Sequence, residues 1–175
     1  QVKYNASALD AEKNASSSVR VDSMRKEVFV ARHVPTPEAV RALYMTACVA
    51  GTPSFRKDLV ALVQTTEINS LIIDIKDFSG GISFPTENTF LKGAVGVGCV
   101  ASDMRDFIAD LHEKGIYVIG RITVFQDPYY TSRYPELAVK RASDISLVWK
   151  DYKGLNFIEV GAEEYWIYIV ELSKE

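Results

Sequence analysis

The sequence lacks a long apolar run, a cluster of like charges and any framework of cysteine or histidine residues. No stretch approaches the roughly 18 apolar residues of a membrane-spanning helix, so we expect no membrane span in this chain. The formal net charge is only −3. Nucleic acid is therefore not an expected partner, because phosphate contacts need clustered Lys and Arg side chains.

The few cysteines and histidines also exclude several kinds of chemistry. Cys48 and Cys99 have no Cys-x-x-Cys partner, and the only histidines are His33 and His112. This spacing predicts no zinc site, and we expect neither a metal nor another cofactor. Cys48 follows an apolar run and Cys99 lies in a Gly/Val-rich loop, so two independent cysteines are favoured over a disulfide.

The N-terminal residues differ in composition from the rest of the chain. Residues 5–18 are small and polar without an aromatic side chain, and residues 27–31 form a short β-like segment. We therefore expect a flexible linker or N-terminal extension at residues 1–37 and one folded domain at residues 38–175. The chain begins at Gln1 rather than Met, which fits removal of an upstream signal and an extracytoplasmic or cell-envelope location.

Predicted strands and helices alternate through the folded domain. Short apolar runs predict strands at 42–47, 70–76 and 116–124, and apolar residues at helical spacing predict helices at 54–66, 103–114, 131–139 and 163–172. Ser54 is the expected cap of the first helix, and residues 144–160 are expected to be irregular. This alternation is typical of a parallel sheet with crossover helices.

The expected fold class is therefore α/β, a TIM-type (β/α) barrel of which the first three βα units are present. A closed barrel needs eight such units and typically about 250 residues. We expect the sheet to have an open edge, through which the chain could associate with another copy of itself.

The second predicted strand has one apolar and one charged face. Side chains alternate along a strand, so Leu71, Ile73 and Ile75 suit the helix layer. Asp74 and Lys76 are then expected to point toward the barrel axis.

The neighbouring strands add polar residues to the same inner face. Tyr44 and Arg121 are expected to point inward, and Asp77 and Asp127 follow the ends of strands. Because α/β enzymes place their reacting groups at the carboxyl ends of strands, Asp74 and Asp77 are the candidate catalytic carboxylates. The candidate substrate-binding residues of this face are Tyr44, Lys76, Arg121 and Asp127.

A purely structural role for these charges is also compatible with the sequence. Asp74 could simply neutralise Lys76 and Arg121, because a charge in a protein interior must be paired. For the same reason we expect the two cations to orient a carboxylate rather than to react.

Aromatic residues gather in the segments that follow the second and third strands. Flat aromatic faces bind sugar rings well, and neighbouring carboxylates can bind the sugar hydroxyls. We expect Trp149 and Tyr129 to be solvent-facing platforms, with Asp151 beside Trp149 as a further binding residue.

Four segments together resemble one known family. They are Val-Ala-Gly-Thr-Pro at 49–53, Ile-Ile-Asp-Ile-Lys-Asp at 72–77, Leu-His-Glu-Lys-Gly-Ile-Tyr-Val-Ile-Gly-Arg-Ile-Thr-Val-Phe-Gln-Asp-Pro at 111–128 and Val-Trp-Lys-Asp-Tyr-Lys-Gly-Leu at 148–155. Over roughly residues 38–175 the sequence resembles the bacterial glycosyl-hydrolase domain family DUF4015.

The resemblance implies a (β/α) barrel related to glycoside hydrolases and a role in carbohydrate metabolism. It carries Asp74, Lys76, Asp77, Arg121 and Asp151 onto matching positions of the family. Members also have a Phe-Asp-Tyr-x-Arg-Phe/Tyr-Pro element, whose aspartate on a fourth strand is the leading catalytic candidate. This element is not in the sequence, so part of the active site is expected to be missing.

Three hypotheses follow from these features. The first is a hydrolase that attacks a polysaccharide through paired carboxylates. The second is a catalytically silent carbohydrate-binding barrel, and the third is a fragment that needs a partner chain to complete its sheet. A fold alone does not choose among them, because barrels support many functions.

Overall fold

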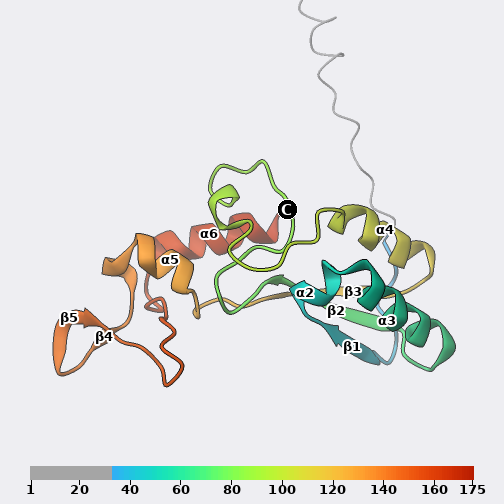
Figure 1. Cartoon of the computed structure of the whole chain (residues 1–175), viewed down its shortest axis with the longest axis horizontal. Coiled ribbons are helices and arrows are strands. Elements are labelled where there is room, and N and C mark those ends of the chain that lie inside the picture. Colours follow the sequence, from blue (N-terminus) through green and yellow to red (C-terminus); the bar gives the residue numbers. More distant parts are fainter. Residues whose placement is uncertain (1–32) are drawn as a thin grey trace, which may run out of the picture. The chain divides into compact units, whose positions relative to one another are not determined.

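The computed structural model describes residues 33–175, which form a mixed α/β domain (Figure 1). The β-like segment expected at 27–31, and most of the expected N-terminal extension, lie outside the described residues. None of the described helices is both long enough and apolar enough to cross a lipid bilayer.

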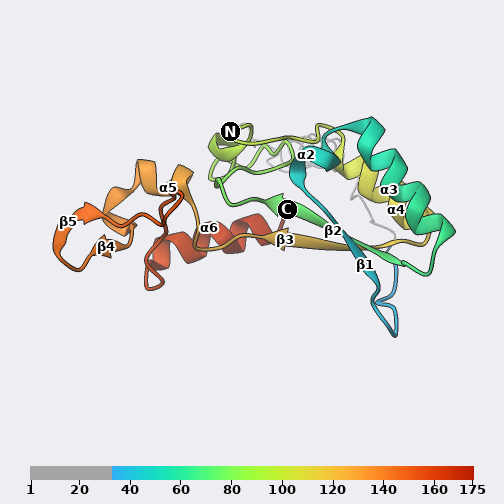
Figure 2. The same ribbon diagram turned by 60° about the horizontal axis from the view of Figure 1, so that its bottom comes forward.

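Three parallel strands form the central sheet. They are β1 (Ala42–Met45), β2 (Ser70–Lys76) and β3 (Tyr117–Ile122), in the order β1-β2-β3 (Figure 2). Ala42 pairs with Ser70, and Ser70 pairs with Tyr117. The prediction of adjacent parallel strands is therefore confirmed, and β2 lies in the middle of the sheet.

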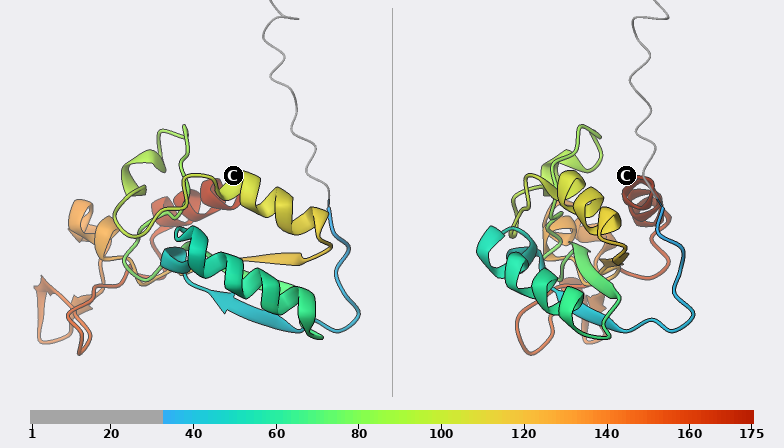
Figure 3. Two further views of the ribbon diagram at one scale, coloured as in Figure 1. Left: turned by 45° about the vertical axis from the view of Figure 1, so that its right-hand side comes forward. Right: turned by 90° about the vertical axis from the view of Figure 1, so that its right-hand side faces the viewer.

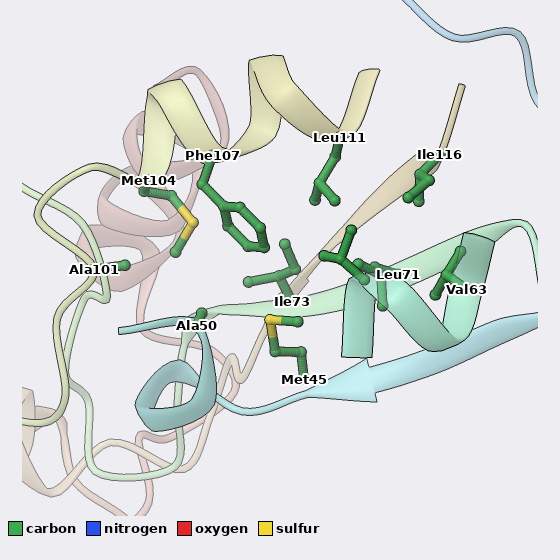
Figure 4. Packing of buried hydrophobic residues seen from close by; sticks show 11 residues of the cluster. Met45, Ala50, Val63, Leu71, Ile73, Ala101, Met104, Phe107, Leu111 and Ile116 are labelled. Carbon is green, nitrogen blue, oxygen red and sulfur yellow. The ribbon is translucent and has the colours of Figure 1, made fainter. Parts of the chain in front are cut away.

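Two helices cover one face of this sheet. The helices α3 (Pro53–Thr65) and α4 (Met104–Glu113) lie side by side over the strands (Figure 3), as expected. Leu71 and Ile73 point from β2 toward Phe107 and Leu111 of α4 (Figure 4), and both β2 side chains are fully buried. Complete burial of such a side chain contributes about 1.5–3 kcal/mol, so this core holds the helix layer to the sheet.

A second core forms beyond the carboxyl end of β2. The helix α6 (Glu163–Ser173) buries Tyr165, Tyr168 and Leu172 against the chain that follows β2, including the short 3-10 helix η1 (Lys92–Ala94). Ile75, Ile122 and Val124 of the sheet strands and their extensions pack against this cluster. The amphipathic helix predicted near 163–172 is thus confirmed.

Two other helices differ from expectation for local reasons. The first strand ends at Met45 because the hydroxyl of Thr46 accepts a hydrogen bond from Val49 N at 3.3 Å and begins the short helix α2 (Ala47–Ala50). Helix α3 follows Thr52 with Pro53 in its first turn, so Ser54 is not its cap.

The helix predicted at 131–139 is replaced by two shorter elements. Asp127 caps α5 (Pro128–Arg133) by accepting a hydrogen bond from Tyr130 N at 2.7 Å. Pro135 cannot continue that helix and instead begins the 3-10 helix η2 (Pro135–Leu137).

The segment expected to be irregular contains a β-hairpin. Strands β4 (Lys140–Arg141) and β5 (Asp144–Val148) pair antiparallel, followed by an isolated bridge between Lys150 and Asn156. Almost every side chain of β5 is exposed, so the segment has no alternation of buried and exposed positions that would predict a strand.

The expectation of two independent cysteines is wrong. Cys48 of α2 forms a disulfide with Cys99, with the two Cα atoms 4.8 Å apart and a sequence separation of 51. The bond joins the segment after β1 to the loop that precedes α4. Long sequence separation hid this proximity, because only the folded sheet brings the two loops together.

Candidate active site

The face of the sheet opposite the helices carries a cluster of three polar side chains. Asp74 of β2 is 3% exposed, and its Oδ1 accepts a hydrogen bond from Arg121 Nη1 of β3 at 2.6 Å. Its Oδ2 accepts a hydrogen bond from the hydroxyl of Tyr44 on β1. The predicted shared face and ion pair of these three residues, here called the open cluster, are confirmed.

Burial and hydrogen bonds raise the pKa of two members of the open cluster, Tyr44 and Arg121. Arg121 Nη1 also lies 3.1 Å from the Tyr44 hydroxyl oxygen, to which it donates. Partial burial and the adjacent Asp74 carboxylate raise the pKa of Tyr44, so its hydroxyl keeps its proton and acts as the donor to Asp74. The hydrogen bond to Asp74 likewise raises the pKa of Arg121.

Lys76 does not join this cluster, contrary to the prediction. An irregularity between Asp74 and Lys76 shifts the register, so that Lys76 pairs with Ile122, whose side chain packs in the second core. One extra residue in a strand reverses the face of every residue after it. The expected alternation therefore held up to Asp74 and failed two residues later.

Lys76 instead forms a buried ion pair with Asp127. Its Nζ lies 3.0 Å from Asp127 Oδ2 and donates to the carbonyl oxygen of Thr123 at 2.7 Å. Both charged side chains are fully buried. Burial lowers the pKa of Lys76, while the Asp127 carboxylate opposes that shift.

Asp127 connects three further parts of the molecule. In addition to capping α5, it accepts a hydrogen bond at 2.8 Å from the hydroxyl of Tyr165 on α6. Gly80 has a φ of 89°, and a Cβ atom there would collide with the Asp127 carboxylate. Lys76, Asp127 and Tyr165 are here called the buried cluster, and their satisfied contacts are typical of a structural role.

Asp77 lies directly after β2 but has its own partners. Its Oδ1 accepts hydrogen bonds from Ser79 N at 2.8 Å and from Ser79 Oγ at 2.5 Å. Among the described residues, none donates a hydrogen bond to its Oδ2, which faces Gly98. The structure therefore links Asp77 to neither cluster by a hydrogen bond.

The expected aromatic platforms have different environments. Trp149 is 41% exposed, and its ring centroid is 5.6 Å from that of Phe157. Tyr129 is half-buried rather than fully exposed, and Arg133 covers one face of its ring, with Arg133 Cζ 3.8 Å from the ring centroid. Asp151, near Trp149, accepts hydrogen bonds from Lys153 N and Leu155 N and so shapes its own loop.

Sequence reasoning did not single out Tyr165 or Ser79. Tyr165 follows the helical spacing of α6 and reads as an ordinary core residue, whereas Ser79 lies two residues after Asp77, a spacing typical of an Asx turn. Within residues 33–175, no group of three or more His, Cys, Asp or Glu side chains could hold a metal ion.

The parallel sheet, its one-sided helix layer and the open cluster define an α/β protein with a polar, ionised site on the bare face of the sheet. The family DUF4015, described as "Putative glycosyl hydrolase domain", matches residues 42–175. The chain belongs to this family.

A crystal structure of a hypothetical protein from Ruminiclostridium thermocellum ATCC 27405 is similar to this chain. The two are 30% identical in sequence, with a TM-score of 0.66, over 75% of this chain and 68% of that chain. None of the curated proteins matches this chain.

Proposed function

We propose that this chain contributes Asp74 to the active site of a glycoside hydrolase that acts on a polysaccharide and has a (β/α) barrel fold. The observation that carries the proposal is the open cluster: a nearly buried carboxylate, held on both oxygens, on the bare face of a parallel sheet. Membership in a family described as a glycosyl hydrolase domain supports the same reading.

The geometry suits Asp74 to the role of an ionised carboxylate. Both of its oxygens accept hydrogen bonds, from Arg121 and from Tyr44, so it stands ready as a nucleophile or a base rather than as a proton donor. Glycosidases use a second carboxyl group about 5–5.5 Å away for retention or about 6.5–9.5 Å away for inversion. Asp77, whose Oδ2 is free of hydrogen bonds from the described residues, is the candidate partner.

A catalytically silent carbohydrate-binding barrel is the second candidate function. It is favoured by the saturation of the open cluster, because Arg121 and Tyr44 already occupy both oxygens of Asp74. In that case Arg121, whose side chain is 46% exposed, would bind sugar hydroxyls or acid groups without any bond being broken.

We also propose an oxidising location and an association surface. Disulfides persist outside the reducing cytosol, so the bond between Cys48 and Cys99 supports an extracytoplasmic or envelope location. In the described sheet, β1 and β3 each have one unpaired edge. Unpaired edges invite pairing with another chain, and light scattering at several protein concentrations would detect the resulting oligomer.

The test of the proposed function is turnover in the full-length protein, measured as reducing ends released from a panel of polysaccharides. Asp74→Asn should reduce turnover about 100-fold or more, because it removes a group engaged in the chemistry. Asp58→Asn, an exposed aspartate of α3, is the matched control and should leave turnover unchanged.

Two other results would contradict the hydrolase. Unchanged turnover in Asp74→Asn would show that Asp74 is structural. Glycan binding without any release of reducing ends would instead establish the silent binding barrel, particularly if Asp74→Asn weakens that binding.

A further inference from the structure

Helix α6 is apolar on two opposite faces. One face is buried in the second core, and the other exposes Trp166 to 47%, Ile167 to 60% and Val170 to 52%. Successive residues of a helix lie about 100° apart around its axis, so the exposed side chains centre directly opposite the buried ones. A surface helix normally carries polar residues on that side, so this apolar face is typical of an interaction surface.

Opposite charges stand at the two ends of the apolar stripe. Glu163 in the first turn and Lys174 at the C-cap are in line with Ile167 and Val170, because the four residues are spaced by four, three and four. Among residues 33–175, no cation forms an ion pair with Glu163. Lys174 binds Glu171 of its own helix at 2.6 Å, but its side chain is 64% exposed and can bind a second carboxylate. The outer face of α6 is defined here as Glu163, Trp166, Ile167, Val170 and Lys174.

The indole of Trp166 is fixed in position at one edge of the outer face. Its Nε1 donates to the carbonyl oxygen of Val160 at 2.9 Å, so its one polar atom already has a partner. The side chain of Val160 is itself exposed. An aromatic ring held in this way offers a large apolar area at a low cost in conformational entropy, which favours contact with another protein surface.

Two other occupants fit the outer face less well. Exposed carboxylates of Glu159, Glu163 and Glu164 surround its N-terminal end, whereas helices that lie on anionic lipid are rich in Lys and Arg. In a (β/α) barrel the helices form the outer ring, with one face on the sheet. Further units of such a barrel would therefore add neighbours beside α6 rather than over its outer face.

We propose that the outer face of α6 binds the same face of a second copy of this chain, with the two helices antiparallel about a two-fold axis. Such an axis, placed midway between Ile167 and Val170, sets Ile167 of each copy against the partner's Val170. The same axis sets Glu163 against the partner's Lys174, because the two pairs of residues share one midpoint along the helix. Parallel helices would instead bring like charges together.

The contact is small and differs from the unpaired edges of β1 and β3. At about 1.5 Å per residue α6 is only about 17 Å long. An interface of this size is typical of a weak dimer. We therefore expect monomer and dimer to exchange as the protein concentration changes.

The test is sedimentation velocity of the full-length protein between about 1 and 300 µM, a range that covers weak association. The unchanged protein should shift from monomer to dimer as its concentration rises. Ile167→Glu should weaken dimerisation about tenfold or more, because it places a charge at the centre of the contact. Ile145→Glu, at an exposed position of β5, is the matched control and should dimerise as the unchanged protein does.

Charge reversals test the antiparallel arrangement. Glu163→Lys and Lys174→Glu, each alone, bring like charges together at two symmetric contacts and should weaken the dimer about tenfold. A mixture of these two variants has opposite charges at both contacts and should dimerise about as tightly as the unchanged protein. A contact through the sheet edges predicts no such rescue.

Three results would overturn the proposal. The first is a monomer at every concentration, and the second is a dimer that Ile167→Glu leaves unchanged, which would place the contact elsewhere. The third is weakening by both charge reversals without rescue in the mixture. Binding to phosphatidylglycerol vesicles that Ile167→Glu abolishes, in a protein that stays monomeric, would identify the outer face as a lipid-binding surface instead.

Discussion

Two ion pairs in this domain join a cation and an aspartate near the same end of the sheet, yet their surroundings differ. Arg121 and Asp74 lie on the bare face, with the Arg121 side chain 46% exposed. Lys76 and Asp127 lie among the side chains of the second core, and both are fully buried. Water can therefore hydrate the Arg121 guanidinium of the first pair, whereas both charges of the second pair are shielded from it.

This difference assigns different roles to similar residues. A fully buried pair is costly to break, because the remaining charge cannot be hydrated. The buried cluster accordingly ties the end of β2 to α5 and α6 and is shielded from solvent. In the open cluster the Arg121 side chain reaches solvent and can meet a ligand.

The largest expected effect tests the buried cluster. Asp127→Asn keeps the shape of the side chain but leaves the Lys76 ammonium without its counter-charge, and we expect a loss of about 3–5 kcal/mol in unfolding free energy. Urea denaturation measures the loss. The double variant Lys76→Met/Asp127→Asn should be more stable than Asp127→Asn alone, and a further loss in the double variant would contradict a coupled pair.

A smaller loss is expected when the disulfide is removed. Cys48→Ser/Cys99→Ser should cost about 2–4 kcal/mol, because the bond closes a long loop and restricts the unfolded chain. Thermal unfolding with and without a reducing agent checks this: the agent should lower the Tm of the unchanged protein and leave the double variant unaffected. Two free thiols in the denatured, unreduced protein would show that no disulfide forms.

Alkaline pH should destabilise the second core by about 1.4 kcal/mol per pH unit for each buried phenol. Burial raises the pKa of Tyr165 and Tyr168 well above the ordinary 10.0. The unfolded chain then loses those protons above pH 10 while the folded state keeps them, so their stabilisation is complete below pH 10 and declines above it.

The variant Tyr165→Phe isolates this effect. Above pH 10 it should reduce the slope of unfolding free energy against pH by about 1.4 kcal/mol per pH unit, the contribution of one buried phenol. When tyrosine ionisation is followed by ultraviolet absorbance, the late phase of the variant should contain one tyrosine fewer than that of the unchanged protein. An unchanged slope would place the Tyr165 hydroxyl in contact with solvent.

The smallest stability effect is expected at the open cluster. Arg121→Gln should cost about 1–2 kcal/mol in unfolding free energy, less than Asp127→Asn, because Tyr44 still donates a hydrogen bond to the nearly buried Asp74 carboxylate. A loss as large as that of Asp127→Asn would remove the distinction between the two clusters.

The sequence was sufficient for the regular part of the fold. A short apolar run predicted β2 with its observed bounds, and helical spacing predicted α4 to within a residue at each end. Strand alternation also placed Asp74 and Arg121 on one face correctly. These patterns are local, and burial of one face enforces them.

The errors have physical causes that are not visible in the sequence. The register shift after Asp74 moved Lys76 to the other face, and nothing in the residues of β2 signals such a shift. The disulfide depends on how the sheet brings together loops that are distant in sequence. The β4–β5 hairpin buries almost none of its side chains, so the usual hydrophobic signal for strands is absent.

The central claim is that the open cluster serves chemistry and the buried cluster serves stability. The most direct test measures unfolding free energy and polysaccharide turnover together in full-length Asp74→Asn and Asp127→Asn. We predict that Asp74→Asn changes the unfolding free energy by about 1 kcal/mol or less while its turnover falls about 100-fold. Asp127→Asn should lose about 3–5 kcal/mol and keep its turnover per folded molecule. The reverse pattern, with Asp74→Asn strongly destabilised and still active, would contradict the account.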